Sequence, residues 1–211
     1  GGLEVLMQLN LLEDFDLAAL GHNSAEALHL VAEAIKVTKA DVYAYAVDPA
    51  HASMPTAGLV SKTFADDRRS LIDRDRAMPF PDAGVPDGAE RRTARAAAPA
   101  RRGAYETSVP GSTTSFTVVD TAGNVVVATP TLGSLWGTGV VVGETGLLFN
   151  NGSRVGSTAP YPEHANYARG GQIPILNNSP TLVLKDGAPF LALGTPGGET
   201  IGQTQVQVLL N

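Results

Sequence analysis

The chain has 211 residues, 43% of them hydrophobic, and can therefore bury a substantial core within a single domain. Its net charge of -6 argues against a nucleic-acid partner, because no overall basic field gathers phosphate groups. It contains no cysteine for disulfides or metal ligation, and no apolar run reaches the roughly 18 residues of a membrane span. We expect neither a metal nor a cofactor, since these histidines show no metal-ligand spacing: His22, His29, His51 and His164.

The first part of the chain is predicted to be helical. Leucines recur every third residue from Leu3 to Leu12, which indicates a helix with a one-sided apolar face that ends before Gly21. Asn23 followed by Glu26 is a candidate capping box for a second helix, which is expected to run to about Tyr45. The apolar side of that helix is predicted to carry Leu28, Val31, Ala32 and Ile35.

Residues 61–73 predict a short exposed helix, with Phe64 and Leu71 turned inward and the charged side chains outward. From residue 78 to 111 the composition changes to proline, glycine, alanine and arginine, with few large apolar side chains. Such a segment cannot offset its ordering entropy, so we expect a mobile linker from about residue 78. Its arginine cluster is interpreted as solvated, in preference to a binding site for a polyanion.

The second part of the chain predicts strands. Alternating apolar residues and turn signals place strands at residues 113–120, 124–132, 139–142, 146–149, 180–184 and 190–193. Residues 152–173 are interpreted as a long loop, and a helix is expected from Glu199 to Leu210. Helices before and after sequential hairpins favour an α+β fold.

Thr113 stands where a linker becomes a strand, which we expect to be buried. If the chain were cut before it, its hydroxyl and a new α-amino group would lie side by side. An α-amine has a pKa of about 7.7–8.0, so its neutral form could take the hydroxyl proton near pH 7. From the residues alone, however, a threonine that simply favours a strand is the preferred interpretation.

The segment that starts TTSFTVVD, residues 113–151, and the segment 177–211 resemble the small-subunit start of the γ-glutamyltranspeptidase family. These N-terminal nucleophile hydrolases cleave their own precursor before such a threonine. The resemblance implies a four-layer αββα sandwich, present here only in part. It also implies that residues 1–112 are the C-terminal part of a large subunit and residues 113–211 the N-terminal part of the small catalytic subunit. Family members carry several hundred residues before the position of Gly1, so a signal peptide could lie upstream.

The resemblance also implies roles for individual residues. The cleavage site falls between Ser112 and Thr113, and Thr113 matches the family nucleophile. Thr131 matches a second threonine whose hydroxyl bonds to the nucleophile. Gly197 and Gly198 match a turn whose backbone N–H groups form the oxyanion hole.

The chain departs from the family where the transpeptidases bind the glutamyl group. Gly133 stands in place of an asparagine, Gly152 in place of a glutamine or glutamate, and Val155 in place of an aspartate. The family's serine pair becomes Leu176 and Asn177. A buried ammonium or carboxylate without a partner costs several kcal/mol. We therefore expect a catalytic site whose acyl pocket differs from one for glutamate.

The function predicted from these features is a self-processing amidohydrolase or acyltransferase acting on a small-molecule amide. Three alternatives stay open: a genuine γ-glutamyl enzyme, a biosynthetic hydrolase of carbon–carbon bonds from the same family, and a non-catalytic paralogue. The compartment also stays open, because the family is often periplasmic or extracellular whereas a biosynthetic paralogue would be cytoplasmic.

Overall fold

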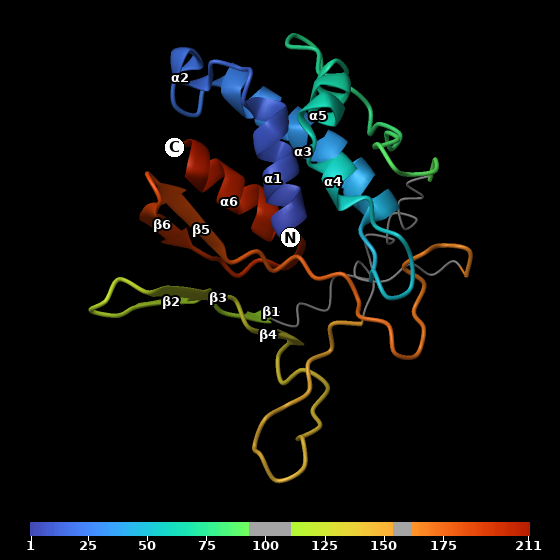
Figure 1. The fold of residues 1–211 in the computed structure, drawn as a ribbon, viewed down its shortest axis with the longest axis vertical. Helices are drawn as coiled ribbons and strands as arrows, with labels where there is room; N and C mark the ends of the chain where they lie inside the picture. The colour runs from blue at the N-terminus through green and yellow to red at the C-terminus, as the bar shows by residue number, and fades with distance from the viewer. Residues whose placement is uncertain (93–110, 154–161) are drawn as a thin grey trace.

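A computed structural model describes residues 1–92, 111–153 and 162–211. Figure 1 shows the helices gathered on one side and the paired strands on the other, with the first helix packed beside the last. The helices are α1 (Gly2–Leu12), α2 (Leu17–Leu20), α3 (Ala25–Tyr45), α4 (Thr56–Leu59), α5 (Lys62–Arg69), the 3₁₀ turn η2 (Gly198–Thr200) and α6 (Ile201–Leu210). The strands are β1 (Gly111–Thr113), β2 (Phe116–Val119), β3 (Val125–Ala128), β4 (Thr131–Ser134), β5 (Thr181–Lys185) and β6 (Ala188–Leu193). The predicted α+β class is confirmed.

The helix α1 forms where predicted, but its buried face is not the row of leucines. Leu6 is 54% exposed, whereas Val5, Leu11 and the carboxylate of Glu4 are buried. Residues spaced by three drift around a helix of about 3.6 residues per turn, so the row cannot stay on one face. The predicted apolar face is therefore wrong at Leu6.

The helix α3 begins one residue later than the predicted capping box implies. Its N-cap is Ser24, whose hydroxyl accepts a hydrogen bond from Ala27 N at 3.1 Å. Asn23 lies just outside the helix with a φ of 53°, and its amide nitrogen is 3.0 Å from the ring of His22. Serine and asparagine are similarly good N-caps, so the prediction of Asn23 is wrong by one residue.

The apolar residues predicted for one side of α3 divide between the core and the surface. Val31 is buried and Ile35 is half-buried, but Leu28 is 44% exposed and Ala32 is also exposed. Packing against α1 selects a neighbouring stripe instead. The main core cluster comprises Val5, Leu11, Leu12, Leu30, Val31, Ala34, Val37 and Val206. A second cluster comprises Met7, Val42, Ala44, Tyr45, Ala46, Leu59, Phe64 and Ala83.

The helix α5 buries Phe64 as predicted, but it ends at Arg69, short of the predicted end at Asp73, and the directions predicted for two side chains are wrong. Leu71 is 42% exposed, and Arg68 turns inward. Arg68 Nε donates to Asp41 Oδ2 at 3.0 Å, and its Nη2 donates to the Asp82 carbonyl at 2.8 Å. This pairing is what allows a charged side chain to be buried.

The beginning of the predicted linker, residues 78–92, is hydrogen-bonded to α3. Lys36 Nζ donates to the Met78 carbonyl at 2.5 Å, and the Tyr45 hydroxyl donates to the Gly84 carbonyl at 2.9 Å. Residues 93–110, which include most of the arginine cluster, lie outside the described residues. The mobility of the linker stays a prediction.

The strands form antiparallel pairs. The hairpins β2–β3 and β5–β6 are confirmed, and Val141 forms a bridge to Leu148 around the turn predicted between them. The two long strands predicted at 113–120 and 124–132 are each broken, so that β1 pairs with β4 separately. Pro130 has no N–H for the ladder, which explains the break in the second strand.

The hairpin β2–β3 leaves apolar side chains open to solvent. Every residue of β2 is exposed, and Phe116, Val118 and Val126 are 50%, 55% and 58% exposed. A sheet buries an apolar face only against a further layer. The prediction of a buried strand after Thr113 is therefore not met within the part of the chain that the structure describes.

Candidate active site

Two threonines face each other across β1 and β4. The antiparallel register pairs Thr113 with Thr131, and both are half-buried. Their hydroxyl oxygens lie 2.8 Å apart, which is hydrogen-bonding distance. The structure thus brings together two residues that are 18 positions apart in the sequence.

The hydroxyl of Thr131 is the centre of a small network. It accepts a hydrogen bond from Gly133 N at 2.9 Å and lies 3.5 Å from the carbonyl oxygen of Ser112. A hydroxyl can accept two hydrogen bonds and donate one. With Gly133 N–H in one accepting position, the oxygen can still accept from Thr113 while its own proton points to Ser112. Gly133 is buried and has a φ of 86°, a conformation that glycine adopts without strain.

Asn151 joins the loop that carries Gly152 to the end of β4. Its Oδ1 accepts from Ser134 N at 2.8 Å, its Nδ2 donates to Ser134 Oγ at 2.9 Å, and its backbone N donates to the Leu132 carbonyl at 3.0 Å. These bonds hold Gly152 next to the strand of Thr131. Sequence analysis did not single out Asn151, whose signal is the pair of asparagines before Gly152.

Gly152 and Leu176 lie together. A Cβ atom at Gly152 would be 3.3 Å from Leu176 Cδ2 and 3.0 Å from Asn150 Oδ1. Leu176 is 42% exposed, so its apolar side chain is available at this surface. The third predicted position of the pocket, Val155, lies outside the described residues.

Asn177 lies against the start of α1. A Cβ atom on Gly1 would be only 2.3 Å from the Asn177 carbonyl oxygen, so residue 1 must be small here. The next residue, Asn178, donates its side-chain amide to the Thr129 carbonyl at 2.6 Å. Segment 176–178 is thereby attached to the chain just before Thr131.

Gly197 and Gly198 form the turn between β6 and α6. Their φ angles are 145° and 57°, and Thr200 N and Oγ1 donate to the Gly197 carbonyl at 3.1 and 2.9 Å. Among the residues that the structure describes, the N–H groups of these two glycines donate no hydrogen bond. Free N–H groups at the start of a helix can stabilise negative charge.

Gly194 places this turn near the threonine pair. A Cβ atom at Gly194 would be 2.2 Å from Ser115 Oγ and 2.8 Å from Thr129 Oγ1, residues two positions from Thr113 and Thr131 respectively. Three residues span at most about 11 Å, so Gly197 lies within about 11 Å of Gly194. Sequence analysis did not identify Gly194, since its signal is a contact between distant segments.

Asp48 makes a long-range link between the first and second parts of the chain. Its Oδ2 accepts from Ile173 N at 2.8 Å, and its Oδ1 accepts from Ala50 N at 3.0 Å. The N–H of Ile173, then that of Ala50, and to a smaller extent the His51 ring, hold the pKa of Asp48 below its usual value. The carboxylate therefore stays charged in its role as an anchor.

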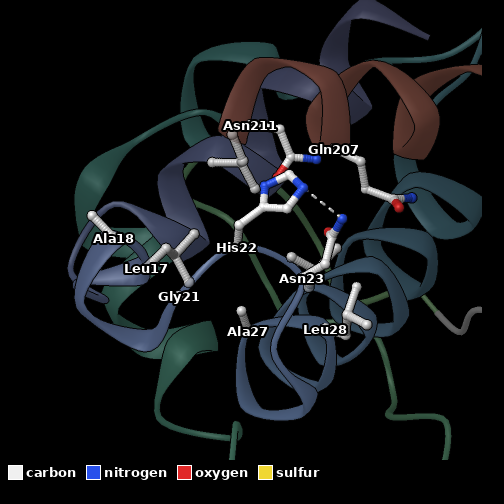
Figure 2. Close-up of a pocket in the computed structure, with 11 residues that line it drawn as sticks. Leu17, Ala18, Gly21, His22, Asn23, Ala27, Leu28, Gln207 and Asn211 are labelled. Carbon is white, nitrogen blue, oxygen red and sulfur yellow. Dashed lines mark hydrogen bonds between the residues drawn. The ribbon is translucent and has the colours of Figure 1, made fainter.

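A hollow of about 280 Å³ lies away from this site, between α2, the start of α3 and the end of α6. Figure 2 shows His22 and Asn23 bonded at its wall, with Gln207 and Asn211 of the last helix nearby. None of the predicted site residues lines it. Within residues 1–92, 111–153 and 162–211, no cluster of three acidic or histidine side chains could hold a metal. No helix there is long and apolar enough to cross a membrane.

Comparison with a solved structure defines the class of fold. The crystal structure of cephalosporin acylase from Bacillus halodurans superposes on 100% of this chain and 33% of its own, with a TM-score of 0.77 and 25% sequence identity. The fold is that of the N-terminal nucleophile hydrolases, and the described residues cover only part of it.

The chain belongs to the γ-glutamyltranspeptidase family, whose profile matches residues 1–211. It is 35% identical to the glutathione hydrolase proenzyme of Escherichia coli K12, over 100% of the chain and 35% of that protein. It is 33% identical to the acylase ACY 1 proenzyme of Pseudomonas sp. SE83, over 100% of the chain and 34% of that protein. The chain thus spans about a third of the length of these relatives.

Proposed function

We propose that the full-length protein is a self-processing amidohydrolase or acyltransferase with Thr113 as its nucleophile and an acyl pocket altered from glutamyl. The observation that supports this best is the distance of 2.8 Å between the hydroxyl oxygens of Thr113 and Thr131. The relatives' description as hydrolase and acylase proenzymes supports the same reaction class and a cut precursor.

In the precursor, the Thr113 hydroxyl attacks the carbonyl carbon of Ser112. Thr131 Oγ1 accepts the hydroxyl proton and donates its own toward the Ser112 carbonyl oxygen, which lies 3.5 Å away. The carbon–nitrogen bond then breaks, the amine takes a proton, and an ester joins Ser112 to Thr113 Oγ1. Water hydrolyses this ester, which leaves a carboxylate at Ser112 and a free amine and hydroxyl at Thr113.

In the processed protein, the same hydroxyl attacks the amide of a small molecule. The new α-amine takes the hydroxyl proton and returns it to the leaving amine, since α-amines ordinarily have a pKa of about 7.7–8.0. The Gly197 and Gly198 N–H groups stabilise the oxyanion, a contribution typically worth about 10²–10³ in rate. Water or an amine acceptor then releases the acyl group from Thr113.

The pocket favours an acyl group without an α-amine. Gly152 offers no side-chain acceptor for an ammonium group, and Leu176 beside it adds apolar surface. Gly133 and Asn177 complete the proposed lining. A lost hydrogen bond to a charged group costs about 1.5–3 kcal/mol. Glutamyl substrates therefore lose this stabilisation of their ammonium group where these acceptors are missing.

The test is covalent capture of the acyl group. The processed full-length protein, mixed with a glutaryl anilide and quenched with acid before steady state, should carry the glutaryl mass on the peptide that begins at Thr113. Thr113→Ala should show neither the adduct nor turnover. An acyl group on another residue would contradict the assignment of Thr113 as the nucleophile. A protein that neither splits nor releases aniline would favour a non-catalytic paralogue.

A further inference from the structure

The turn that carries Gly197 and Gly198 needs contacts from outside to fix its position. Both glycines have positive φ, and residues without a Cβ atom leave the backbone a wide choice of conformations. In the proposed reaction their N–H groups act only when they lie about 2.7–3.1 Å from the developing oxyanion. At the end nearer β6, the close approach of Gly194 to Ser115 and Thr129 restricts the turn.

The other end of the turn is held by Lys39 of α3. Its Nζ donates to the carbonyl oxygen of Glu199 at 3.0 Å. Glu199 follows Gly198 directly, so this bond fixes the peptide plane with which the turn enters α6. The Lys39 side chain is only 12% exposed whereas Glu199 is exposed, so the bond lies where the covered part of α3 meets the surface.

Lys39 is itself held by Glu4 of α1. Its Nζ lies 2.9 Å from Glu4 Oε1, which also accepts from Gln8 Nε2 at 3.3 Å, and the Glu4 side chain is fully buried. Glu4 fits against α6 because residue 202 is glycine: a Cβ atom at Gly202 would lie 2.9 Å from Glu4 Cδ. Residues of α1, α3 and α6 thus meet at this ion pair, and its Lys39 also bonds the end of the turn.

We propose that Lys39 is a positioning residue for the oxyanion-binding turn, acting through Glu199 and anchored by Glu4. This inference rests on the proposed function, which gives the Gly197 and Gly198 N–H groups their task. Lys39 and Glu4 precede the proposed cleavage site and Glu199 follows it. The hydrogen bond from Lys39 to Glu199 therefore keeps the geometry of the small subunit dependent on the large one after the cut.

Lys36 provides a matched control on the same helix. It pairs with Glu33 at 2.6 Å and donates to a backbone carbonyl, that of Met78, just as Lys39 does with Glu4 and Glu199. These partners of Lys36 all lie in the first part of the chain. Loss of Lys36 removes the same kind of contact without touching the turn.

The experiment compares processed full-length wild type, Lys39→Met, Lys39→Arg and Lys36→Met on glutaryl-p-nitroanilide. We expect Lys39→Met to lower kcat by about 10- to 100-fold with KM within about threefold, because misplaced donors weaken only the transition state. The affinity for 4-boronobutanoic acid, whose boron replaces the glutaryl carbonyl carbon, should fall by a similar factor. Lys39→Arg should recover most of the loss, since it keeps the charge and donors. Lys36→Met should stay within about twofold of wild type.

A second readout needs no turnover. In hydrogen exchange, the peptide covering residues 195–201 should exchange faster in Lys39→Met than in wild type. In Lys36→Met its exchange rate should equal that of wild type. Faster exchange in a protein that shows no amidase activity would mean that the anchor is real and the proposed function has failed. Unchanged exchange in Lys39→Met, or an equal loss of kcat in Lys36→Met, would overturn the proposal.

Discussion

Thr113 Oγ1 lies 2.8 Å from Thr131 Oγ1, and the strand register places the two residues directly opposite each other. A third oxygen, the carbonyl of Ser112, lies 3.5 Å from the same Thr131 hydroxyl. One side chain is therefore within reach of both the attacking atom and the bond that the proposed self-cleavage breaks.

The rate of self-cleavage should depend on the hydroxyl of Thr131 and not on the shape of its side chain. Thr131→Val keeps the β-branched side chain but removes the oxygen that bonds Thr113, so we expect the rate of self-cleavage to fall at least about tenfold, the equivalent of about 1.4 kcal/mol. Thr131→Ser keeps the oxygen and should process close to the wild-type rate. Equal rates for the valine and serine variants, followed on denaturing gels, would show that the residue serves only the strand.

The acyl pocket should prefer glutaryl over γ-glutamyl amides. Without a side-chain acceptor at Gly152, the substrate ammonium loses a charged hydrogen bond worth about 1.5–3 kcal/mol, or roughly ten- to a hundredfold in kcat/KM. Gly152→Glu should shift the ratio toward glutamyl, since the nearest atoms to a new Cβ are the ends of the Asn150 and Leu176 side chains. Gly152→Met adds similar bulk without charge and should not. A wild type that already prefers glutamyl would sink this prediction.

Gly194 should be intolerant of any side chain. A Cβ atom there would lie 2.2 Å from Ser115 Oγ and 2.8 Å from Thr129 Oγ1, so Gly194→Ala must displace these two hydroxyls or push β6 away from the threonine pair. A displacement near 1 Å can cost about 100-fold in rate, and overpacking costs about 1–3 kcal/mol of stability. Gly170→Ala is the control, because nothing lies within 4 Å of its Cβ position. Turnover in Gly194→Ala that matches Gly170→Ala would contradict the packing argument.

Asp48 should make stability depend on pH on the acid side. Its pKa is lowered in the folded state, chiefly by Ile173 N–H, so the unfolded chain binds a proton more readily. The stabilisation is present above the ordinary value of about 3.9 and is lost as pH falls toward the lowered pKa. Between pH 5 and pH 3 the Tm of wild type should therefore fall further than that of Asp48→Asn. Equal changes in Tm for wild type and Asp48→Asn would show that the contact of Asp48 with Ile173 does not contribute to stability.

Burial raises the pKa of Asp41, although the charge of Arg68 opposes this shift. The effect of Asp41 on stability therefore depends on pH in the opposite direction to that of Asp48. The contribution of Asp41 is present below the ordinary pKa and is lost as pH rises through the raised value. Since Asp41 is unchanged in Asp48→Asn, its effect cancels in the comparison of the two proteins.

The sequence was sufficient for the features that local chemistry determines. The hairpin closed at Gly123 and the hairpin closed at Gly187 follow from turn residues between alternating apolar positions. The buried faces of α1 and α3 were predicted less well, as Leu6 and Leu28 show, because neighbouring helices decide which stripe is covered.

The candidate site could be predicted only in part. Resemblance to the family pointed to Thr113 and Thr131, whereas spacing alone left an ordinary strand threonine open. The contacts of Lys39 and Gly194 were not predicted, because the partners of these residues lie far away in the sequence. A lysine within an amphipathic helix is usually a solvated residue, and no local pattern reveals that it reaches a distant carbonyl.

The most direct test of the central claim is N-terminal sequencing of the smaller chain from the purified full-length protein. We expect a single new start at TTSFTVVD, that is at Thr113, and an uncut chain for Thr113→Ala. A start at another residue, or efficient splitting of the alanine variant, would contradict it.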